Sequence, residues 1–270
     1  MNIKQITTFS FLLLILSCKE NETSDIKPIP DNGLAQDTSV LRYTEAGKPM
    51  LFEFTSTGCP GCGSWGKPTF HSIINQNKNE IIPIAVHIKY GDPMITPISE
   101  AITSNTYGSR YTPQIWVNDT NGVILAGGSI NGQESVNNLN RLAKNASFNP
   151  KIYMDGRVTK KGNSSIYIKT GIKQSSELKG SDYFLSCYLM NDSLSHNQAS
   201  SPSNPTIHNY VIRQSASGDA WGEQVTFDNA NFEFQFEFKN VDHTKVTNFV
   251  SILWKKEKGR YVPICAYKFQ

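Results

Sequence analysis

The feature that most constrains the fold is a pair of cysteines, Cys59 and Cys62, placed between a buried strand and a helix. Residues 50–55 (MLFEFT) predict a buried strand, and the turn CPGC leads into a predicted helix that runs to about Asn77. Cys59 is then expected at a helix N-terminus, where free N–H groups and the helix dipole stabilise a thiolate. We therefore predict Cys59 as an attacking sulfur and Cys62 as the resolving sulfur of a dithiol.

The elements that follow have the order of the thioredoxin fold. The sequence predicts a strand at 81–88, a helix at 95–107, a strand at 113–118, a hairpin turn at Asn121-Gly122 into a strand at 123–126, and a helix at 133–146. Residues 46–148 thus resemble a thioredoxin-like α/β domain.

Four further residues resemble positions of the thioredoxin family. Glu53, six residues before Cys59, resembles the buried acid that relays the proton of the resolving cysteine. Thr112-Pro113 resembles the loop that docks substrate backbone, and we expect Pro113 to be cis. Pro68 resembles the helix-kinking proline, one position later than usual.

Residues 149–270 predict an all-β domain of immunoglobulin-like sandwich type. Phenylalanine alternates with polar residues along 231–239 (NFEFQFEFK), which is typical of a half-buried antiparallel strand. About seven such short strands are expected in this half, a number that favours a β-sandwich. A long Ser/Asn/Pro-rich loop at 193–205 separates two of them, and loops of this length are often functional.

The cysteines leave alternatives open. Cys59 and Cys62 could be a static disulfide in a thioredoxin scaffold, since a fold does not fix a function. A metal site is not expected, because no second CxxC or paired histidine completes four ligands, and His71 and His87 are interpreted as helix-surface and strand-end residues. Cys187 and Cys265 are expected either as a disulfide or as buried free thiols. No cofactor is predicted.

The N-terminus predicts export and lipid anchoring. Residues 9–16 form an apolar run too short to cross a bilayer, which takes about 20 residues, and the run ends at Ser17-Cys18. This arrangement resembles the bacterial lipobox, in which the cysteine is acylated. We predict a signal peptide at 1–18, lipidation of Cys18 and a flexible polar tether at 19–45. The acidic stretch after Cys18 resembles a surface-export signal. With a net charge of +3 and no basic cluster, the chain is not expected to bind nucleic acid.

Two motifs in order resemble one family. Residues 53–62 (EFTSTGCPGC) and residues 208–213 (HNYVIR), followed by Gly218 and Gly222, are similar to the signatures of the outer-membrane-protein-28-related lipoproteins. The resemblance implies an outer-membrane or surface lipoprotein with a thioredoxin-like domain and an all-β domain. Some members of that family are regarded as adhesins that bind host proteins.

Three functions remain as hypotheses. The first is a thiol–disulfide oxidoreductase or isomerase acting on protein disulfides through Cys59, Cys62 and Glu53, with Thr112-Pro113 docking the substrate. The second is a surface binding module in which the sandwich loops, above all residues 193–205, contact a partner protein or glycan. The third is an accessory subunit of a larger surface assembly. The sequence does not decide whether the chain is an enzyme.

Overall fold

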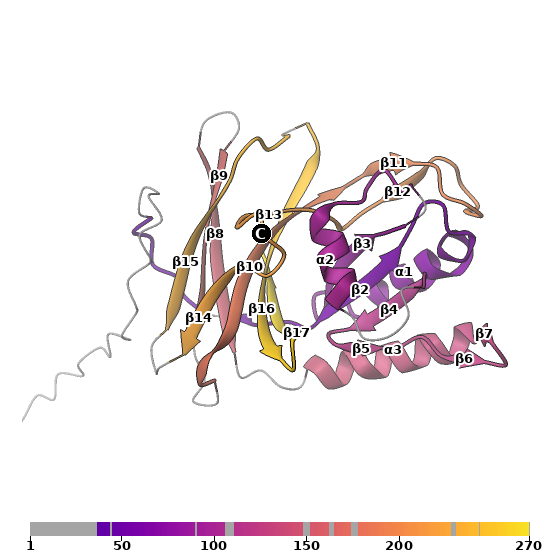
Figure 1. Cartoon of the computed structure of the whole chain (residues 1–270), viewed down its shortest axis with the longest axis horizontal. Helices are drawn as coiled ribbons and strands as arrows, with labels where there is room; N and C mark the ends of the chain where they lie inside the picture. The colour runs from indigo at the N-terminus through magenta and orange to yellow at the C-terminus, as the bar shows by residue number, and fades with distance from the viewer. Residues whose placement is uncertain are drawn as a thin grey trace, which may run out of the picture.

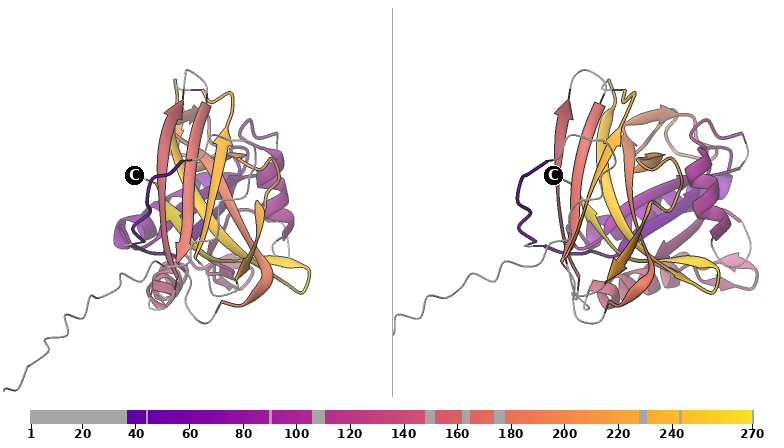
Figure 2. Two further views of the ribbon diagram at one scale, coloured as in Figure 1. Left: turned by 90° about the vertical axis from the view of Figure 1, so that its left-hand side faces the viewer. Right: turned by 60° about the vertical axis from the view of Figure 1, so that its left-hand side comes forward.

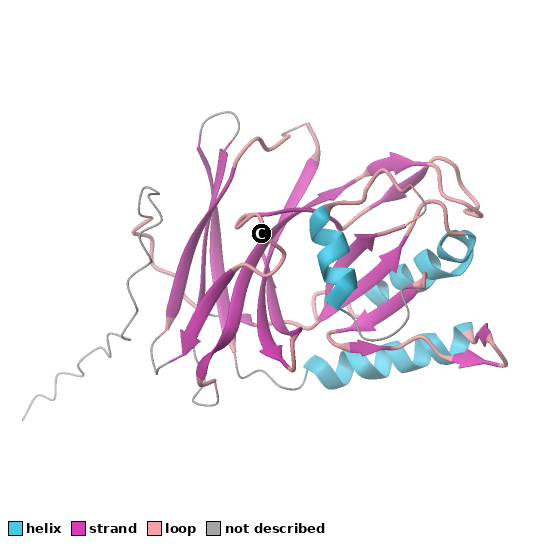
Figure 3. Ribbon diagram, in the orientation of Figure 1, coloured by secondary structure: helices cyan, strands magenta, loops and turns pink. Residues whose placement is uncertain are grey.

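Strands dominate the molecule, and its helices gather at one end (Figures 1 and 3). The structure is a computed structural model that describes residues 37–269 except 44, 90, 106–110, 148–151, 162–164, 174–177, 228–230 and 243. Cys18, the predicted signal peptide and most of the predicted tether lie outside the described residues. No helix among the described residues is long and apolar enough to span a bilayer.

The first half of the chain is an α/β unit built on a mixed sheet. Strand β2 (Met50–Thr55) is central: it runs parallel to β3 (Ile82–His87) and antiparallel to β4 (Gln114–Val117), which pairs with β5 (Thr120–Asn121). The predicted order of strands and helices is confirmed by this connectivity.

Helices cover both faces of this sheet because β2 is apolar on both. Leu51 joins the core under α1 (Lys67–Gln76) and α3 (Gly132–Ser147), whereas Phe52 and Phe54 join the core under α2 (Pro97–Asn105). Successive side chains of a strand point to opposite faces. Glu53 is therefore directed, like Leu51, toward the face covered by α1 and α3.

The predicted hairpin turn at Asn121-Gly122 is wrong by three residues. The turn falls at Asn118-Asp119, because Val117 pairs with Thr120 and Asn118 takes a positive φ of 49°. The Gly122 amide donates to the Ile115 carbonyl and so extends the ladder. Asparagine tolerates the left-handed region, which explains why an Asn-Asp pair forms the turn here. A small hairpin of β6 (Leu125–Ala126) and β7 (Ser129–Ile130) follows.

The second half of the chain forms two β layers that pack face to face (Figure 2). One layer contains β8 (Tyr153–Lys161), β9 (Ser165–Lys173) and β15 (Phe232–Phe238), and β1 (Glu45–Ala46), from the N-terminal part of the chain, pairs with β8 at its edge. The other contains β10 (Gly180–Asp192), β13 (Val211–Ser215), β14 (Glu223–Phe227), β16 (Val246–Glu257) and β17 (Arg260–Lys268). The alternating phenylalanines of β15 are buried in the core between the layers, as the sequence predicts.

The two halves share one sheet. Strand β13 of the second half pairs with β10 on one side and, at Val211 and Ala85, in parallel with β3 of the first half. In the described residues, the larger sheet thereby reaches nine strands and runs from β17 to β5. A hairpin of β11 (Leu194–His196) and β12 (Thr206–His208) also extends from the second half over the first (Figure 1).

The last part of the predicted tether is not free. Residues 37–43 lie on the outer face of the smaller layer, where the Lys169 ammonium donates to the carbonyls of Asp37 and Ser39 and pairs with Glu233 at 2.9 Å. Leu41 is buried against this face. Glu233 is consequently buried as well, so β15 is buried on both sides rather than half-buried.

Candidate functional site

The pair Cys59 and Cys62 lies at the start of a helix, directly after β2. The two sulfurs form a disulfide, and the exposed fractions are 5% for Cys59 and 0% for Cys62. The backbone amide of Cys62 donates to the Cys59 sulfur at 3.1 Å. An N–H group at this place would stabilise negative charge on Cys59 in the reduced pair. The predicted strand–CPGC–helix arrangement is confirmed.

The helix opens with a π-helical turn, η1 (Cys62–Gly66), before α1 begins. A π turn closes its hydrogen bonds one residue later than an α turn, and such turns are frequent at functional sites. Pro68, the predicted helix-kinking proline, follows this π turn; because η1 and α1 are continuous, it lies inside the helix and removes one N–H donor there.

Pro113 closes the other side of the dithiol turn. Its peptide bond with Thr112 is cis, as predicted. The Pro113 ring lies so close to η1 that a Cβ added to Gly66 would come within 2.6 Å of the Pro113 Cβ. A Cβ added to Gly61, inside the CPGC turn, would lie 3.2 Å from the Pro113 Cδ. The structure therefore brings together the cis-proline and the dithiol turn, although Pro113 lies 51 residues after Cys62 in the chain.

Glu53 is a buried carboxyl beside this turn. It is 5% exposed, and its Oε1 has no hydrogen-bond partner among the described residues. A Cβ placed on Gly66 would lie 3.7 Å from that oxygen, so Glu53 faces the helix start. Burial raises the pKa of Glu53 to about 7, although the Lys67 ammonium opposes the shift. A carboxyl that titrates near neutrality is suited to accept and return a proton.

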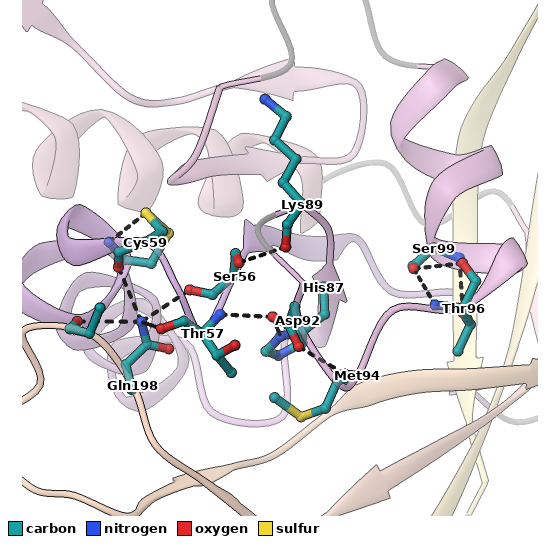
Figure 4. A network of polar contacts seen from close by, with 12 residues as sticks. Ser56, Thr57, Cys59, His87, Lys89, Asp92, Met94, Thr96, Ser99 and Gln198 are labelled. Carbon is teal, nitrogen blue, oxygen red and sulfur yellow. Dashed lines mark hydrogen bonds and ion pairs between the residues drawn. A yellow bond between two sulfur atoms is a disulfide. The ribbon is translucent and has the colours of Figure 1, made fainter.

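A buried glutamine from the second half of the chain holds the residues before Cys59 (Figure 4). The Gln198 Nε2 donates to the carbonyls of Ser56, Thr57 and Cys59 at 3.0, 3.2 and 3.1 Å. The Ala199 amide donates to the same Thr57 carbonyl at 2.8 Å. Sequence reasoning missed Gln198, because no local pattern marks a contact across 139 residues.

An Asp–His pair holds the same segment from the other side (Figure 4). The Asp92 Oδ2 accepts from the Thr57 amide at 2.7 Å and lies 2.7 Å from the His87 Nδ1. Burial lowers the pKa of His87, although Asp92 opposes the shift. Burial also acts to raise the pKa of Asp92, but its hydrogen bonds outweigh that effect and hold the pKa below its usual range. The pair is therefore a neutral histidine and an ionised aspartate, with His87 at the strand end as predicted.

The two other described cysteines are free and buried in the second half. Cys187 is on β10 and Cys265 on β17, and β16 lies between these strands, so the sulfurs cannot pair. Burial raises the pKa of each thiol to about 12. Of the two alternatives, the free-thiol interpretation is confirmed.

No metal centre is evident in the part of the chain that the structure describes: no group of three or more His, Cys, Asp or Glu residues there is arranged to hold an ion.

The fold has a counterpart among solved structures. HBP35 of Porphyromonas gingivalis aligns with a TM-score of 0.66 and 17% identity over 83% of this chain and 75% of that chain. A domain of the outer membrane lipoprotein Omp28 from the same organism aligns with a TM-score of 0.32 and 12% identity over 44% of this chain and 87% of that chain. No family model matches the sequence, and no curated protein does. The comparison with HBP35 supports the fold alone.

Proposed function

We propose that this chain is an exported lipoprotein whose thioredoxin-like unit carries out thiol–disulfide exchange through Cys59 and Cys62. The observation that carries the proposal is the convergence of three features at one helix start: the Cys59–Cys62 disulfide, cis-Pro113 and the buried Glu53. The second half is proposed as an immunoglobulin-like sandwich that supports this unit.

The exchange follows from the placement of the two sulfurs. In the reduced pair, the Cys59 thiolate attacks one sulfur of a substrate disulfide, and the other substrate sulfur leaves as a thiolate. Cys62 then attacks the Cys59 sulfur and displaces the second substrate thiolate, which forms the Cys59–Cys62 disulfide. Two electrons pass to the substrate, and the reverse sequence oxidises a substrate dithiol.

Glu53 and Pro113 are assigned supporting roles in these steps. Cys62 is fully buried, so its thiol needs a nearby base before it can attack. Glu53, with a pKa raised to about 7 by burial, takes that proton and later returns it. The backbone at Thr112-Pro113, beside the CPGC turn, is the place where an extended substrate segment docks.

The test is the pH dependence of iodoacetamide alkylation in the reduced full chain, with the modified sulfur located by mass spectrometry. We expect an apparent pKa for Cys59 well below about 8.5 and protection of Cys62. We also expect the chain to reduce a disulfide-bonded peptide, and the Cys59→Ser and Cys62→Ser variants to fail. A Cys59 pKa at or above that of an ordinary thiol would contradict the proposal and favour the alternative, in which Cys59 and Cys62 form a static disulfide in a thioredoxin scaffold.

The proposed location is the outer membrane, through acylation of Cys18. Support comes from the short apolar run that ends at Ser17-Cys18 and from the resemblance to outer-membrane lipoproteins. Labelling with a palmitate analogue in a Gram-negative host is expected to mark the wild-type chain and not Cys18→Ser. Labelling of both would place the anchor elsewhere.

A binding module remains the second candidate, on the evidence of the exposed part of the predicted binding loop. Residues 202–205 are exposed, and Ile207 on β12 is 48% exposed. Gln198 of the same loop is buried against the lead-in to Cys59, so only part of the loop is available to a partner. Substitution of residues 202–205 should abolish partner capture and leave exchange intact if this candidate is correct.

A further inference from the structure

Gln198 lies on the loop between β11 and β12, and it reaches the dithiol segment from the far half of the chain. The residue is 2% exposed, and its Nε2 lies within 3.2 Å of the Ser56, Thr57 and Cys59 carbonyl oxygens. In Figure 4 the amide approaches the backbone on the side away from the sulfurs. Gln198 therefore contacts the turn on the side opposite the sulfurs and does not itself lie over the disulfide.

The loop is built to hold this amide in place. Two hydrogen bonds close the turn of this loop. The backbone N–H of Gln198 donates to the Asn204 Oδ1 at 2.8 Å, and the backbone N–H of Ser201 donates to the Gln198 backbone carbonyl at 3.2 Å. The loop backbone also lies directly on the first helical turn after Cys62: a Cβ added to Gly63 would stand 2.0 Å from the Ala199 carbonyl oxygen. Only glycine permits that approach.

The β11–β12 hairpin is fixed to the helix at a second point. The Lys67 ammonium, at the start of α1, donates to the Ile207 carbonyl on β12. On the neighbouring strand position the His208 ring lies against His87, with ring centroids 5.2 Å apart. The hairpin thus contacts both the helix that carries Cys62 and the network that holds Thr57.

The contacts of Gln198 bear directly on the charge of the Cys59 sulfur. Carbonyl oxygens carry negative partial charge, and three of them, on Ser56, Thr57 and Cys59, accept from the Gln198 Nε2 in the segment that ends at Cys59. The Gln198 N–H group offsets that charge and fixes the Cys59 carbonyl. The Cys62 amide, which donates to the Cys59 sulfur, is held in the same turn. The Gln198 side-chain amide can therefore stabilise the Cys59 thiolate without contacting its sulfur.

We infer that Gln198 is a positioning residue for the dithiol: its side-chain amide fixes the Cys59 backbone and stabilises the thiolate of the reduced pair. This inference rests on the proposed exchange function. According to this inference, the second half of the chain contributes to thiol–disulfide exchange in the first half, because the β11–β12 loop holds the Cys59 backbone in position.

The test compares Gln198→Ala and Gln198→Glu with Gln214→Ala, an exposed glutamine on β13. Three quantities are measured on the reduced full chain: the pH profile of Cys59 alkylation, the equilibrium constant with a glutathione redox buffer, and the circular dichroism spectrum. Loss of the amide in Gln198→Ala should slow alkylation at pH 7 roughly two- to tenfold and make the disulfide harder to reduce.

The side chain in Gln198→Glu has the same shape as glutamine, but its carboxylate accepts hydrogen bonds and would face the three backbone carbonyl oxygens, which also only accept. The effect of Gln198→Glu should therefore be larger than that of Gln198→Ala. Gln214→Ala should match wild type in all three measurements. Gln198→Ala remains informative if Gln198→Glu does not fold. A stabilised Cys59 thiolate in wild type with unchanged profiles in folded Gln198 variants would overturn the inference alone. A wild-type Cys59 with an ordinary pKa would remove the proposed function and this inference together.

Discussion

The two halves of the molecule hold their cysteines in opposite ways, although all four described cysteines are buried. Exposed fractions are 5% and 0% for Cys59 and Cys62, and 0% and 5% for Cys187 and Cys265. The first pair begins a helix, with an amide directed at the leading sulfur. The second two lie inside strands, where burial raises the pKa of each thiol to about 12.

The difference teaches that accessibility alone does not distinguish a reactive cysteine from an inert one here. In a strand interior, the backbone N–H groups are committed to the ladder. Burial there raises the pKa of both thiols, and for Cys187 it outweighs the hydrogen bond with the Ser251 side chain. At a helix start the first N–H groups have no intrahelical partner, so they are available to a sulfur. The backbone geometry of CPGC, rather than exposure, separates the two halves.

The largest expected effect is a contrast in alkylation rate between the two sets of thiols. At pH 8, a pKa of about 12 leaves the thiolate fraction of Cys187 and Cys265 roughly a thousandfold below that of an ordinary thiol. We therefore expect iodoacetamide to modify Cys59 in the reduced, folded chain while Cys187 and Cys265 stay unmodified, as read by peptide mass spectrometry.

Unfolding in urea should remove this contrast and make Cys59, Cys62, Cys187 and Cys265 react alike. Cys59→Ser should abolish the folded-state signal from the CPGC peptide. Rapid modification of Cys187 or Cys265 in the folded chain would show that the second half opens to solvent, and the comparison would fail.

The next largest expected effect is a change in the free energy of unfolding, and it depends on Glu53, the carboxyl beside the reactive cysteine pair. Between its ordinary pKa of 4.5 and the folded value of about 7, Glu53 binds more protons in the folded chain than in the unfolded one. Its contribution to stability is thus fully present below pH 4.5 and is lost as the pH rises through 7. The free energy of unfolding of the wild-type chain should therefore fall by on the order of 3 kcal/mol between pH 4 and pH 8, and that of Glu53→Gln should not show this fall. Urea unfolding of the oxidised chain measures both.

Glu100→Gln, on the exposed side of α2, is the matched control and should keep the wild-type pH dependence. If wild type and Glu53→Gln lose the same stability over this range, Glu53 is not buried as a neutral acid, and its role as proton acceptor has no basis.

The reactive half was the more predictable of the two because its signals are local. Six apolar-rich residues, a CPGC turn and an X-Pro bond before a strand give β2, the helix start and cis-Pro113 from short segments of sequence. Glu53 was predicted from its resemblance, six residues before Cys59, to the buried acid of the thioredoxin family. The hairpin turn was misplaced because Asn-Gly is the stronger turn signal, whereas Asn118-Asp119 satisfies the strand pairing.

The residues that hold the segment before Cys59 in place could not be predicted, because their contacts depend on tertiary packing. Gln198 and Asp92 meet Thr57 across 141 and 35 residues, and nothing in their own segments marks them. Hydrophobic periodicity likewise placed Phe234 in the core but could not show that residues 37–43 cover the other face of β15. A pattern along one strand reports which side chains are apolar, whereas the elements that cover them come from elsewhere in the chain.

The smallest expected effect tests whether the inert thiols matter only as packing. The Cys265 sulfur fills space against Gly47, where a Cβ would lie 2.8 Å from it, and approaches the Met154 sulfur at 3.6 Å. Cys265→Ala removes these contacts and should lower the free energy of unfolding by on the order of 1 kcal/mol in urea titration. The Cys59 alkylation profile should not move, because the change removes no contact of the dithiol turn. A shifted profile with a folded variant would mean that the shared sheet transmits packing changes from β17 to the helix start, and the two cysteine environments could no longer be treated as independent.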